Sequence, residues 1–228
     1  MRLIVNERDA HALEEAVLLK ERHGGAVVAV APEAPEVDEA LFTALAKGAD
    51  RAVKIAGLDA GLCTRALAVR VAGTLPAANL LPADLLLTGC QAIDDLDGQA
   101  APQLAQALKF PYLGLVTQVA LEPGTGRATV TKEFAGGVRG EFEVTLPAVL
   151  GIQAAEKPPR YVPVAKVRAA MKTQKIETIP AAGAPAAALV EVLQLAKPEA
   201  AGHAEMLTGS PAEAAGKLCG ILLERGVL

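Results

Sequence analysis

The sequence predicts an α/β fold with a mainly parallel sheet, followed by an antiparallel meander and a C-terminal arm. In the first half, short apolar runs such as AVVAVA at 26–31 alternate with helical patterns. Strands that alternate with helices in this way form crossover units and a parallel sheet. After residue 115 the strands are separated by glycine turns, such as PGTG at 123–126, which is typical of an antiparallel meander.

The expected elements follow in order along the chain. Helices are predicted where apolar residues recur at helical spacing, with Gly24 and Gly48 ending the first two and Ser210 capping the last. Strands are predicted where apolar runs are short or alternate with polar residues. The helices cover 9–23, 37–47, 60–75, 98–108 and 211–228, and the strands cover 26–31, 52–55, 84–88, 115–121, 127–134, 138–146 and 147–152.

Three segments follow from this pattern. Residues 1–152 form the α/β domain. Residues 153–185 are expected to be an extended arm that contacts a partner, because three prolines at 158–163 prevent a regular helix and no core-facing periodicity follows. Residues 186–228 form a C-terminal segment that ends in the last helix.

Composition excludes several classes of function. The net charge is -4 and Lys and Arg form no long run, which argues against nucleic acid as a partner. No apolar run approaches the roughly 20 residues that a membrane helix needs, so direct membrane insertion is not expected. The N-terminus is charged too soon for a signal peptide, and the scattered Cys63, Cys90 and Cys219 suit neither disulfides nor zinc. We expect a reduced, cytoplasmic protein.

The most informative stretch is TGCQAIDDLDGQ at 88–99, which follows a predicted parallel strand and opens a helix. Open parallel sheets bind ligands at this position. Gly89 would let the backbone approach a ligand, Asp97 would cap the helix, and the first N–H groups of that helix would offer an anion site. Asp94 and Asp95 must then point to ribose hydroxyls or to the loop's own amides. The alternative is an acidic surface turn without a ligand.

Catalytic and metal sites are not expected. The one serine, Ser210, is a helix cap rather than a nucleophile. The three histidines, His11, His23 and His203, share no ligand spacing, and the acidic loop lacks the alternating ligands of an EF-hand. Cys90 could be a reactive thiol, but without a neighbouring basic residue a packing role is the better interpretation.

Several motifs occur in order along the chain: NERD at 6–9, LEEA at 13–16, LAKGADR at 45–51, GCQAIDD at 89–95, LPAV at 146–149 and PRY at 159–161. Together they resemble the beta subunits of electron transfer flavoproteins, over nearly the whole chain from Asn6 onward. The GCQAIDD loop, with Gln99 after it, is the most specific of these motifs. The resemblance implies a Rossmann-like domain of the adenine nucleotide alpha hydrolase type.

The resemblance also implies cofactors and a partner. The family's beta subunit pairs with a larger alpha subunit that holds most of the redox FAD, while the beta subunit carries a structural AMP. No catalytic residue is implied, because the chain would bind and position cofactors. The residues that match the family's AMP contacts are Asn6, Glu7, Arg8, Asp9, Pro32, Gly89, Cys90, Gln91, Ala92, Ile93, Asp94, Asp95, Leu96, Asp97, Gly98, Gln99 and Ala100.

Residues 161–167 resemble the loop with which the family docks on acyl-CoA dehydrogenases. Val164 stands nearest to the family's usual leucine anchor. Arg160, Tyr161 and Val167 complete the expected docking surface, and the basic residues that follow would steer the encounter.

One departure from the family concerns the N-terminus. The family has a further central strand before the position of Asn6, whereas residues 1–5 alone precede it here. Without that strand the sheet would be open by about two strand spacings, roughly 9–10 Å. Either the sequence starts late, or residues 1–5 and a neighbour cover the gap.

The resemblance therefore implies an electron carrier, which passes electrons from acyl-CoA and other dehydrogenases through FAD to a quinone oxidoreductase of the respiratory chain. Two alternatives are open. An electron-bifurcating relative would hold a second FAD at the AMP position, although the QAIDD loop favours AMP. A stand-alone nucleotide-binding protein of the stress-protein kind would share the fold and be stable as a monomer.

Overall fold

The chain folds into two compact units, Met1–Val192 and Leu193–Leu228. The computed structural model describes residues 4–58, 62–93, 95, 98–182, 193–194, 196, 202 and 204–228. The second unit contains α6 (Pro211–Glu224). The first unit contains the helices α1 (Glu7–His23), α2 (Val37–Lys47), α3 (Thr64–Ala77), α4 (Ala100–Leu108) and α5 (Val164–Thr173), the strands β1 (Val28–Pro32), β2 (Arg51–Ala56), β3 (Leu85–Gly89), β4 (Tyr112–Glu122), β5 (Arg127–Glu133), β6 (Arg139–Thr145), β7 (Ala148–Ile152) and β8 (Glu177–Pro180), and the 3-10 turn η1 (Ala135–Gly137).

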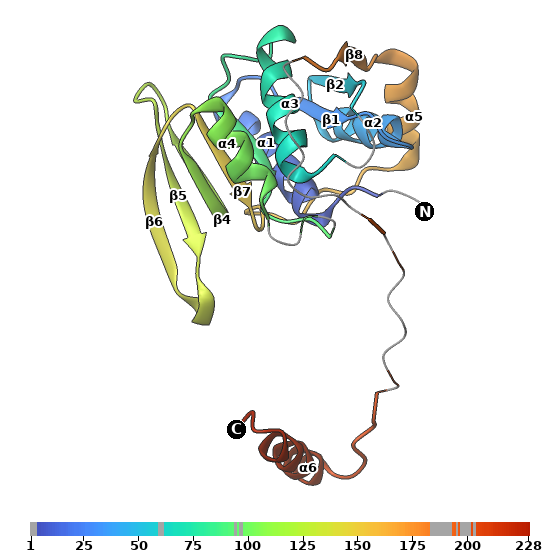
Figure 1. Cartoon of the computed structure of the whole chain (residues 1–228), viewed down its shortest axis with the longest axis vertical. Helices are drawn as coiled ribbons and strands as arrows, with labels where there is room; N and C mark the ends of the chain where they lie inside the picture. The colour runs from blue at the N-terminus through green and yellow to red at the C-terminus, as the bar shows by residue number, and fades with distance from the viewer. Residues whose placement is uncertain are drawn as a thin grey trace. The chain divides into compact units, whose positions relative to one another are not determined.

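The strands of the first unit form two sheets. One has the order β1-β2-β8 and is parallel throughout, and the other has the order β3-β7-β4-β5-β6. In the second sheet β3, β7 and β4 are parallel, whereas β4, β5 and β6 form an antiparallel meander. The meander lies at one side of the unit and β1, β2, α2 and α5 lie at the other (Figure 1). The α/β class, the parallel strands and the meander are thus confirmed.

Helices cover both faces of the larger sheet. On one face, Ala12 and Leu19 of α1 pack in a buried cluster with apolar residues of β4, β5 and β7. On the other face, α3 and α4 pack around Val149 of β7 and Leu86 of β3. A third cluster joins α2 and α5 to Ala52 of β2. Parallel strands are usually covered on both faces in this way, which is why they read as continuous apolar runs in the sequence.

The helix ends follow the local signals in the sequence. Gly24 and Gly48 end α1 and α2 with φ of 78° and 132°, a region of backbone conformation that favours glycine. Ser210 caps α6 as expected: its hydroxyl accepts a hydrogen bond from the Glu213 N–H, and the Glu213 carboxylate accepts one from the Ser210 N–H. The first helix begins at Glu7, two residues before its predicted start, with Asn6 in the N-cap position.

The expectation of an extended arm over 153–185 differs from the structure. Residues Val164–Thr173 form α5, with Pro163 at its N-cap, where the fixed φ of proline is compatible with a helix start. Ala170 and Val167 pack against α2, and β8 adds a parallel strand to β2. The sequence pattern did not predict α5, because only one buried alanine and one partly buried valine hold this short helix in place. It did not predict β8, because the pairing of that strand with β2 uses backbone groups.

Carboxylates of α1 hold the chain that follows β7. Glu14 is 3% exposed, and its oxygens accept hydrogen bonds from the Arg160 N–H and the Arg160 Nε, both at 2.9 Å. Glu15 is 1% exposed and accepts a hydrogen bond from the Glu156 N–H at 3.0 Å. Burial raises the pKa of the Glu15 carboxyl, and the Glu156 N–H partly offsets this. Arg160 also pairs with Glu21 at 2.6 Å, so its guanidinium is bound within the chain.

No helix among the described residues is both long enough and apolar enough to cross a membrane.

The Arg160–Glu14 pair gives a prediction about stability. Arg160→Met should lower the free energy of unfolding by about 3 kcal/mol, because it leaves the buried Glu14 carboxylate without its ionic partner. The matched control is Arg127→Met, which removes a pair with Glu143 in which both side chains are more than half exposed. This change should cost less than about 1 kcal/mol. Urea denaturation of both variants at neutral pH measures the difference, and equal losses would contradict a structural role for Arg160.

Candidate functional site

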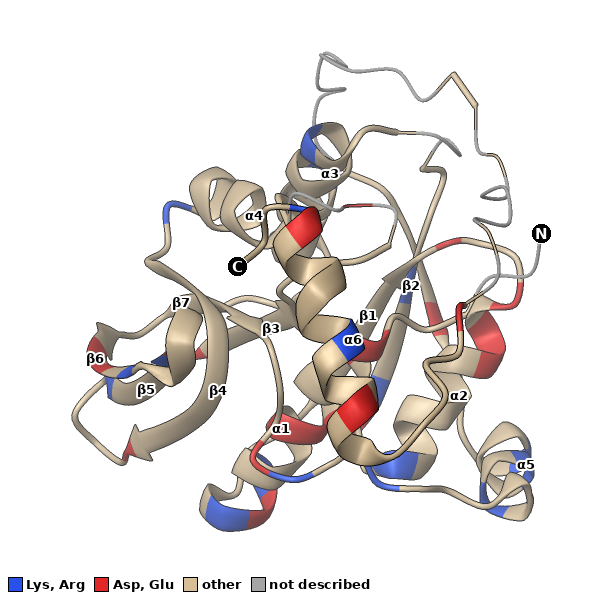
Figure 2. Ribbon diagram, turned by 90° about the horizontal axis from the view of Figure 1, so that it is seen from below, with Lys and Arg blue, Asp and Glu red and all other residues tan. Residues whose placement is uncertain are grey.

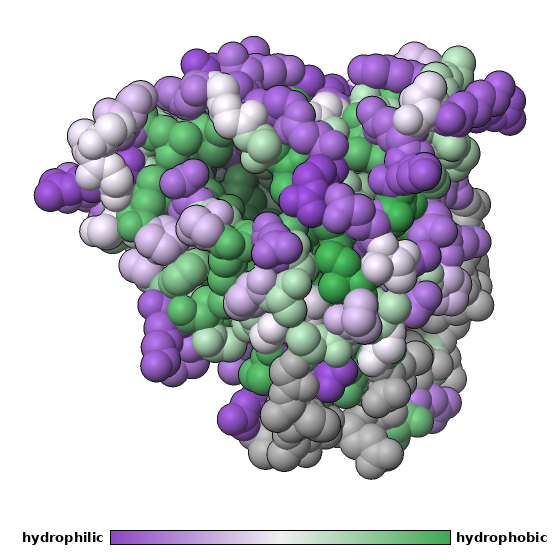
Figure 3. All heavy atoms as spheres, turned by 90° about the horizontal axis from the view of Figure 1, so that it is seen from above, coloured by the Kyte–Doolittle hydropathy of each residue, from purple (hydrophilic) through white to green (hydrophobic). Residues whose placement is uncertain are grey.

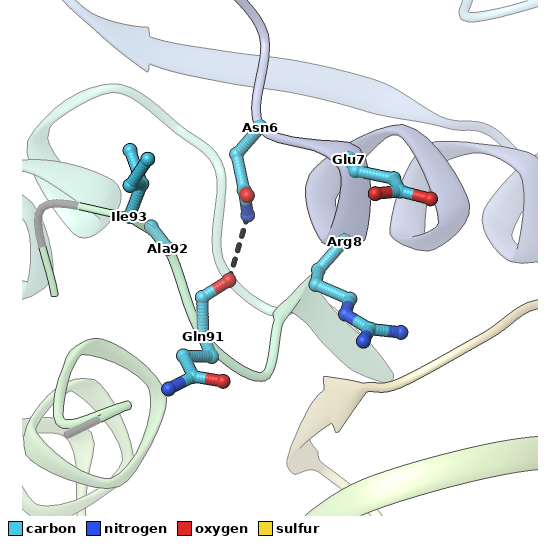
Figure 4. Close-up of a pocket in the computed structure, with 6 residues that line it drawn as sticks. All are labelled: Asn6, Glu7, Arg8, Gln91, Ala92 and Ile93. Carbon is cyan, nitrogen blue, oxygen red and sulfur yellow. Dashed lines mark hydrogen bonds between the residues drawn. The ribbon is translucent and has the colours of Figure 1, made fainter. Parts of the chain in front are cut away.

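The first turn of α1 lies against the carboxyl end of β3, and the loop after β3 passes beside it (Figure 4). The Asn6 side-chain amide donates hydrogen bonds to the Gln91 carbonyl and to the Asp9 carboxylate, both at 2.9 Å. The second Asp9 oxygen accepts a hydrogen bond from the Gly89 N–H at 2.6 Å. Two segments at least 80 residues apart in sequence are thus joined by two short bonds, and the Asn6–Asp9 bond orients the two side chains that make them.

Gly89 is required by the close approach of the first turn of α1. A Cβ at this position would lie 2.7 Å from the Arg8 Cβ, 2.9 Å from the Asn6 Nδ2 and 2.9 Å from the Asp9 backbone nitrogen. Real Cβ atoms essentially never approach other atoms so closely. The structure thus shows a close approach of the first turn of α1 at Gly89, and the predicted approach of a ligand stays a prediction.

The loop after β3 closes on itself. The Asp95 carbonyl accepts a hydrogen bond from the Gly98 N–H at 2.9 Å, and the Asp95 carboxylate accepts one from the Ala100 N–H at 3.0 Å. The expected anion site at the start of α4 is therefore wrong for these two N–H groups, because Asp95 already occupies them. Of the two destinations considered for Asp95, the loop's own amides are confirmed. Asp94, Leu96 and Asp97 lie outside the described residues.

Gly98 completes the closed loop. Its φ is +63°, and a Cβ there would lie 2.5 Å from the Cys90 carbonyl oxygen. Glycine is thus needed at position 98 both for the positive φ and for the close approach of the end of the loop to Cys90 at its start.

Cys90 is a packed thiol. It is 8% exposed, its Sγ donates to the Gln153 Oε1 at 3.0 Å, and burial raises the pKa of the thiol. A raised pKa disfavours the reactive thiolate, which supports the packing interpretation. The Gln153 carbonyl in turn accepts a hydrogen bond from the Arg8 guanidinium at 2.5 Å.

Gln153 was not among the predicted site residues. It follows the fully buried strand β7 and therefore lies at the same carboxyl edge as Gly89. A polar residue directly after a buried parallel strand is the signal that could have identified it.

A hollow of about 190 Å³ opens between α1 and the loop, lined by Asn6, Glu7, Arg8, Gln91, Ala92 and Ile93. The first N–H groups of α1 have no carbonyl partner within the helix, and the Asn6 side chain does not cap them. They carry the positive end of the helix dipole, and the positively charged Arg8, whose guanidinium binds the Gln153 carbonyl, is among the lining residues. The hollow therefore suits an anion, although the Glu7 carboxylate on its wall opposes one.

The other predicted residues lie apart from this hollow. Pro32 ends β1 and does not line it. Tyr161 and Val164 are 84% and 62% exposed, whereas Val167 packs partly buried against the α2–α5 cluster. Of the predicted docking residues, Tyr161 and Val164 are therefore the more exposed, while the Arg160 guanidinium pairs within the chain. Within the described ranges, no group of three or more His, Cys, Asp or Glu side chains is placed to hold a metal ion.

A sheet of parallel strands whose carboxyl edge bears a polar loop and an uncapped helix start is typical of the open α/β class, whose members bind ligands at this edge. Sequence comparison then identifies the family. The family described as "Electron transfer flavoprotein domain" matches residues 2–184. The chain belongs to the electron transfer flavoprotein family and, within it, to the beta subunits, as the motifs in the sequence predicted.

Three individual relatives align with this chain over most of their length. The electron transfer flavoprotein subunit beta of Methylophilus methylotrophus is 32% identical over 96% of this chain and 86% of its own. The subunit beta of Syntrophomonas wolfei is 34% identical over 95% of this chain and 82% of its own. The caffeyl-CoA reductase-Etf complex subunit CarD of Acetobacterium woodii is 30% identical over 99% and 88% of the two chains.

The contact at Gly89 gives a second prediction. Gly89→Ala should lower the free energy of unfolding by about 1–3 kcal/mol, because the new methyl group would displace the first turn of α1. The matched control is Gly220→Ala on α6, where a Cβ meets nothing within 4 Å. This control should be neutral or slightly stabilising, since alanine favours helices. Thermal unfolding of both variants provides the measurement, and an unchanged midpoint for Gly89→Ala would mean that α1 does not rest on β3.

Proposed function

We propose that this chain is the beta subunit of a heterodimeric electron transfer flavoprotein and that it binds a structural AMP. Members of this family are electron carriers rather than classical enzymes. An alpha subunit would complete the heterodimer and hold most of the FAD. Bound FAD would supply the redox chemistry, and the residues of this chain would bind and orient the nucleotides.

The observation that carries the proposal is the hollow between the first turn of α1 and the loop Gln91–Ile93. Its position at the carboxyl edge of β3 is where open α/β sheets bind ligands. Its lining includes Arg8, and the first N–H groups of α1 have no side-chain cap, so both features would favour a phosphate. These features favour a phosphate at α1 over one at α4, where the Ala100 N–H is engaged by Asp95.

The rest of a nucleotide would extend beyond the hollow. At about 190 Å³ the hollow is smaller than the roughly 300 Å³ at which ligand pockets begin. The phosphate would lie at Arg8, whose guanidinium has five donors and uses one of them for the Gln153 carbonyl. The ribose and base would lie along the peptide groups of Gln91 and Ala92, on the outer side of the loop.

The start of α5 is the proposed docking surface for acyl-CoA dehydrogenases. Tyr161 and Val164 are the exposed apolar side chains there, at 84% and 62%. Basic residues gather on the helix that follows (Figure 2). An apolar anchor beside a cationic helix fits a partner with an acidic rim around an apolar pocket. Electrons would pass onward from the heterodimer to a quinone oxidoreductase.

The nucleotide content of the purified heterodimer tests the proposed function. After denaturation and chromatography, the extract should contain one AMP and one FAD per heterodimer. Two FAD and no AMP would overturn the AMP assignment and support a bifurcating protein. A stable monomer that binds nucleotide and does not pair with an alpha subunit would overturn the heterodimer.

A variant links the AMP to the hollow. Arg8→Gln should weaken AMP binding by about tenfold or more, because a charge-assisted hydrogen bond to a phosphate contributes about 1.5–3 kcal/mol. Arg127→Gln, which removes an exposed guanidinium on β5, is the control and should leave AMP retention unchanged.

The docking surface gives a separate prediction. Val164→Ala should slow the reduction of the heterodimer by an acyl-CoA dehydrogenase several-fold, because it shortens the exposed apolar anchor, while flavin content and stability are unchanged. Val138→Ala is the control, since Val138 is similarly exposed, at 59%, on the meander. Steady-state reduction at low and moderate salt is the measurement. Normal rates for Val164→Ala with every dehydrogenase would exclude this surface, and loss of FAD would mean that it serves the alpha subunit.

A further inference from the structure

The segment that follows β7 changes its hydrogen-bond partners where that strand ends. The neighbouring strand β4 continues past Ile152, the last residue of β7 that pairs with it. The Gln153 and Ala154 N–H groups still bond to the Val116 carbonyl of β4. In residues 155–160, which we call the strap, N–H groups bond instead to side chains of α1. The helix thus takes over from the sheet as the support of this segment.

Side chains on one side of α1 receive the N–H groups of the strap. The His11 Nδ1 accepts a hydrogen bond from the Ala155 N–H at 3.1 Å, and the Glu15 Oε2 accepts one from the Glu156 N–H at 3.0 Å. Glu14 holds the far end of the strap in the same way. These helix positions are three and four residues apart and therefore lie on one face. The strap follows that face of α1.

The Glu15 carboxyl is the unusual member of this set. Hydrophilic residues gather along the margins of the face seen in Figure 3, in contact with water, whereas Glu15 is 1% exposed. Its Oε1 is buried and has no hydrogen-bond partner among the described residues. Glu14 has the Arg160 guanidinium at 2.9 Å, but Arg22, a cation that acts on Glu15, is already paired with Glu156. A buried group that lacks partners in this way calls for an explanation.

The neutral form of the Glu15 carboxyl suits these surroundings better than the carboxylate. Burial raises the pKa of Glu15, the Glu156 N–H and the charge of Arg22 lower it in part, and the Glu156 carboxylate raises it further. The buried residues of β4 and β7 that pack against α1 are apolar. On α1 itself, His11 and Glu14 are the neighbouring titratable groups, and both are bonded to the strap. A protonated carboxyl can still accept the Glu156 N–H, because its carbonyl oxygen stays an acceptor.

We propose that Glu15 binds a proton when the strap docks on α1 and releases it to water when the strap lifts, so that the strap is a proton-linked latch. Lifting would hydrate the carboxyl, and a hydrated carboxyl is ionised at neutral pH. The strap leads into Tyr161 and Val164, so the latch would control how firmly the proposed docking surface is held. That consequence rests on the proposed function, whereas the latch itself involves this chain alone.

The pH dependence of the latch has a definite sign. Because docking raises the pKa of Glu15, its contribution is complete below the ordinary pKa of a glutamate and is lost as the pH rises through the raised value. The hydrogen bond from Arg160 lowers the pKa of Glu21, so that contribution is lost as the pH falls. His11 holds Ala155 only while its Nδ1 carries no proton, which also fails at low pH. Of these three groups, Glu15 alone loosens the strap as the pH rises.

An NMR titration of the side-chain carboxyl carbons in the full chain measures the proton on Glu15 directly. The range runs from about pH 4 to about pH 9, which spans the ordinary carboxyl pKa and the values of deeply buried glutamates. Glu15 should titrate at a clearly higher pH than Glu141, an exposed residue of β6. Titration of Glu15 together with Glu141 would overturn the proposal.

Hydrogen exchange of the Glu156 amide measures the latch itself. Its protection, relative to an unstructured peptide at the same pH, should fall by up to about tenfold per pH unit between the ordinary and the raised pKa of Glu15, because one proton is released. Glu15→Gln keeps a neutral oxygen that can accept the Glu156 N–H, and it should abolish this fall. Glu141→Gln is the matched control and should retain the fall.

The Leu150 amide, within β7, is the internal control for wider unfolding. A fall in Glu156 protection that persists in Glu15→Gln would overturn the latch. So would an equal fall at Leu150 in the wild-type chain, because the strap would then not open by itself. If Glu15→Gln exposes Leu150, more than the strap has unfolded, and the titration of Glu15 in the wild-type chain decides between the same two outcomes.

Discussion

The contact between the first turn of α1 and the carboxyl end of β3 is the constraint on which the candidate site depends. The Asp9 carboxylate accepts a hydrogen bond from the Gly89 N–H, and the missing Cβ of Gly89 leaves room for Arg8 and Asn6. This contact fixes where the positive end of the α1 dipole lies. It also fixes one wall of the hollow, and the loop that starts at Cys90 supplies the other. Without it, neither the first turn of α1 nor Arg8 would line the hollow.

The same helix connects the candidate site with the proposed docking surface. Its first turn forms the hollow, while Glu14, Glu15 and Glu21 farther along hold the chain from Glu156 to Arg160. That chain leads directly into the exposed Tyr161 and Val164. Removing Glu14 and Glu15 from water carries an electrostatic cost, which the backbone N–H groups and the Arg160 guanidinium offset. These carboxylates fix the position of the segment from Glu156 to Arg160, which has few apolar side chains of its own. They explain how this irregular, proline-rich stretch takes a defined path.

Much of the fold could be predicted from the sequence because its signals are local. Apolar runs identified β1, β2, β3 and β7, and Gly24, Gly48 and Ser210 marked helix ends. The position of the loop after β3 followed from the order of strand, loop and helix. Long-range contacts could not be predicted in this way. The contact of Gly89 with the first turn of α1 and the pairing of Glu14 with Arg160 both join residues far apart in the sequence. The packing of α5 was missed because it needs only Ala170 and Val167, too few to produce a periodic pattern.

The central claim is that a nucleotide phosphate binds at the first turn of α1 beside the loop after β3. The most direct test is a titration of AMP into the isotope-labelled chain, assembled with its alpha subunit and freed of nucleotide, followed by backbone amide NMR shifts. The account predicts that the largest shifts occur at Glu7, Arg8 and Asp9 and at Gln91, Ala92 and Ile93, and that they saturate together. Shifts confined to the meander or to α6, or no shifts at millimolar AMP, would contradict it.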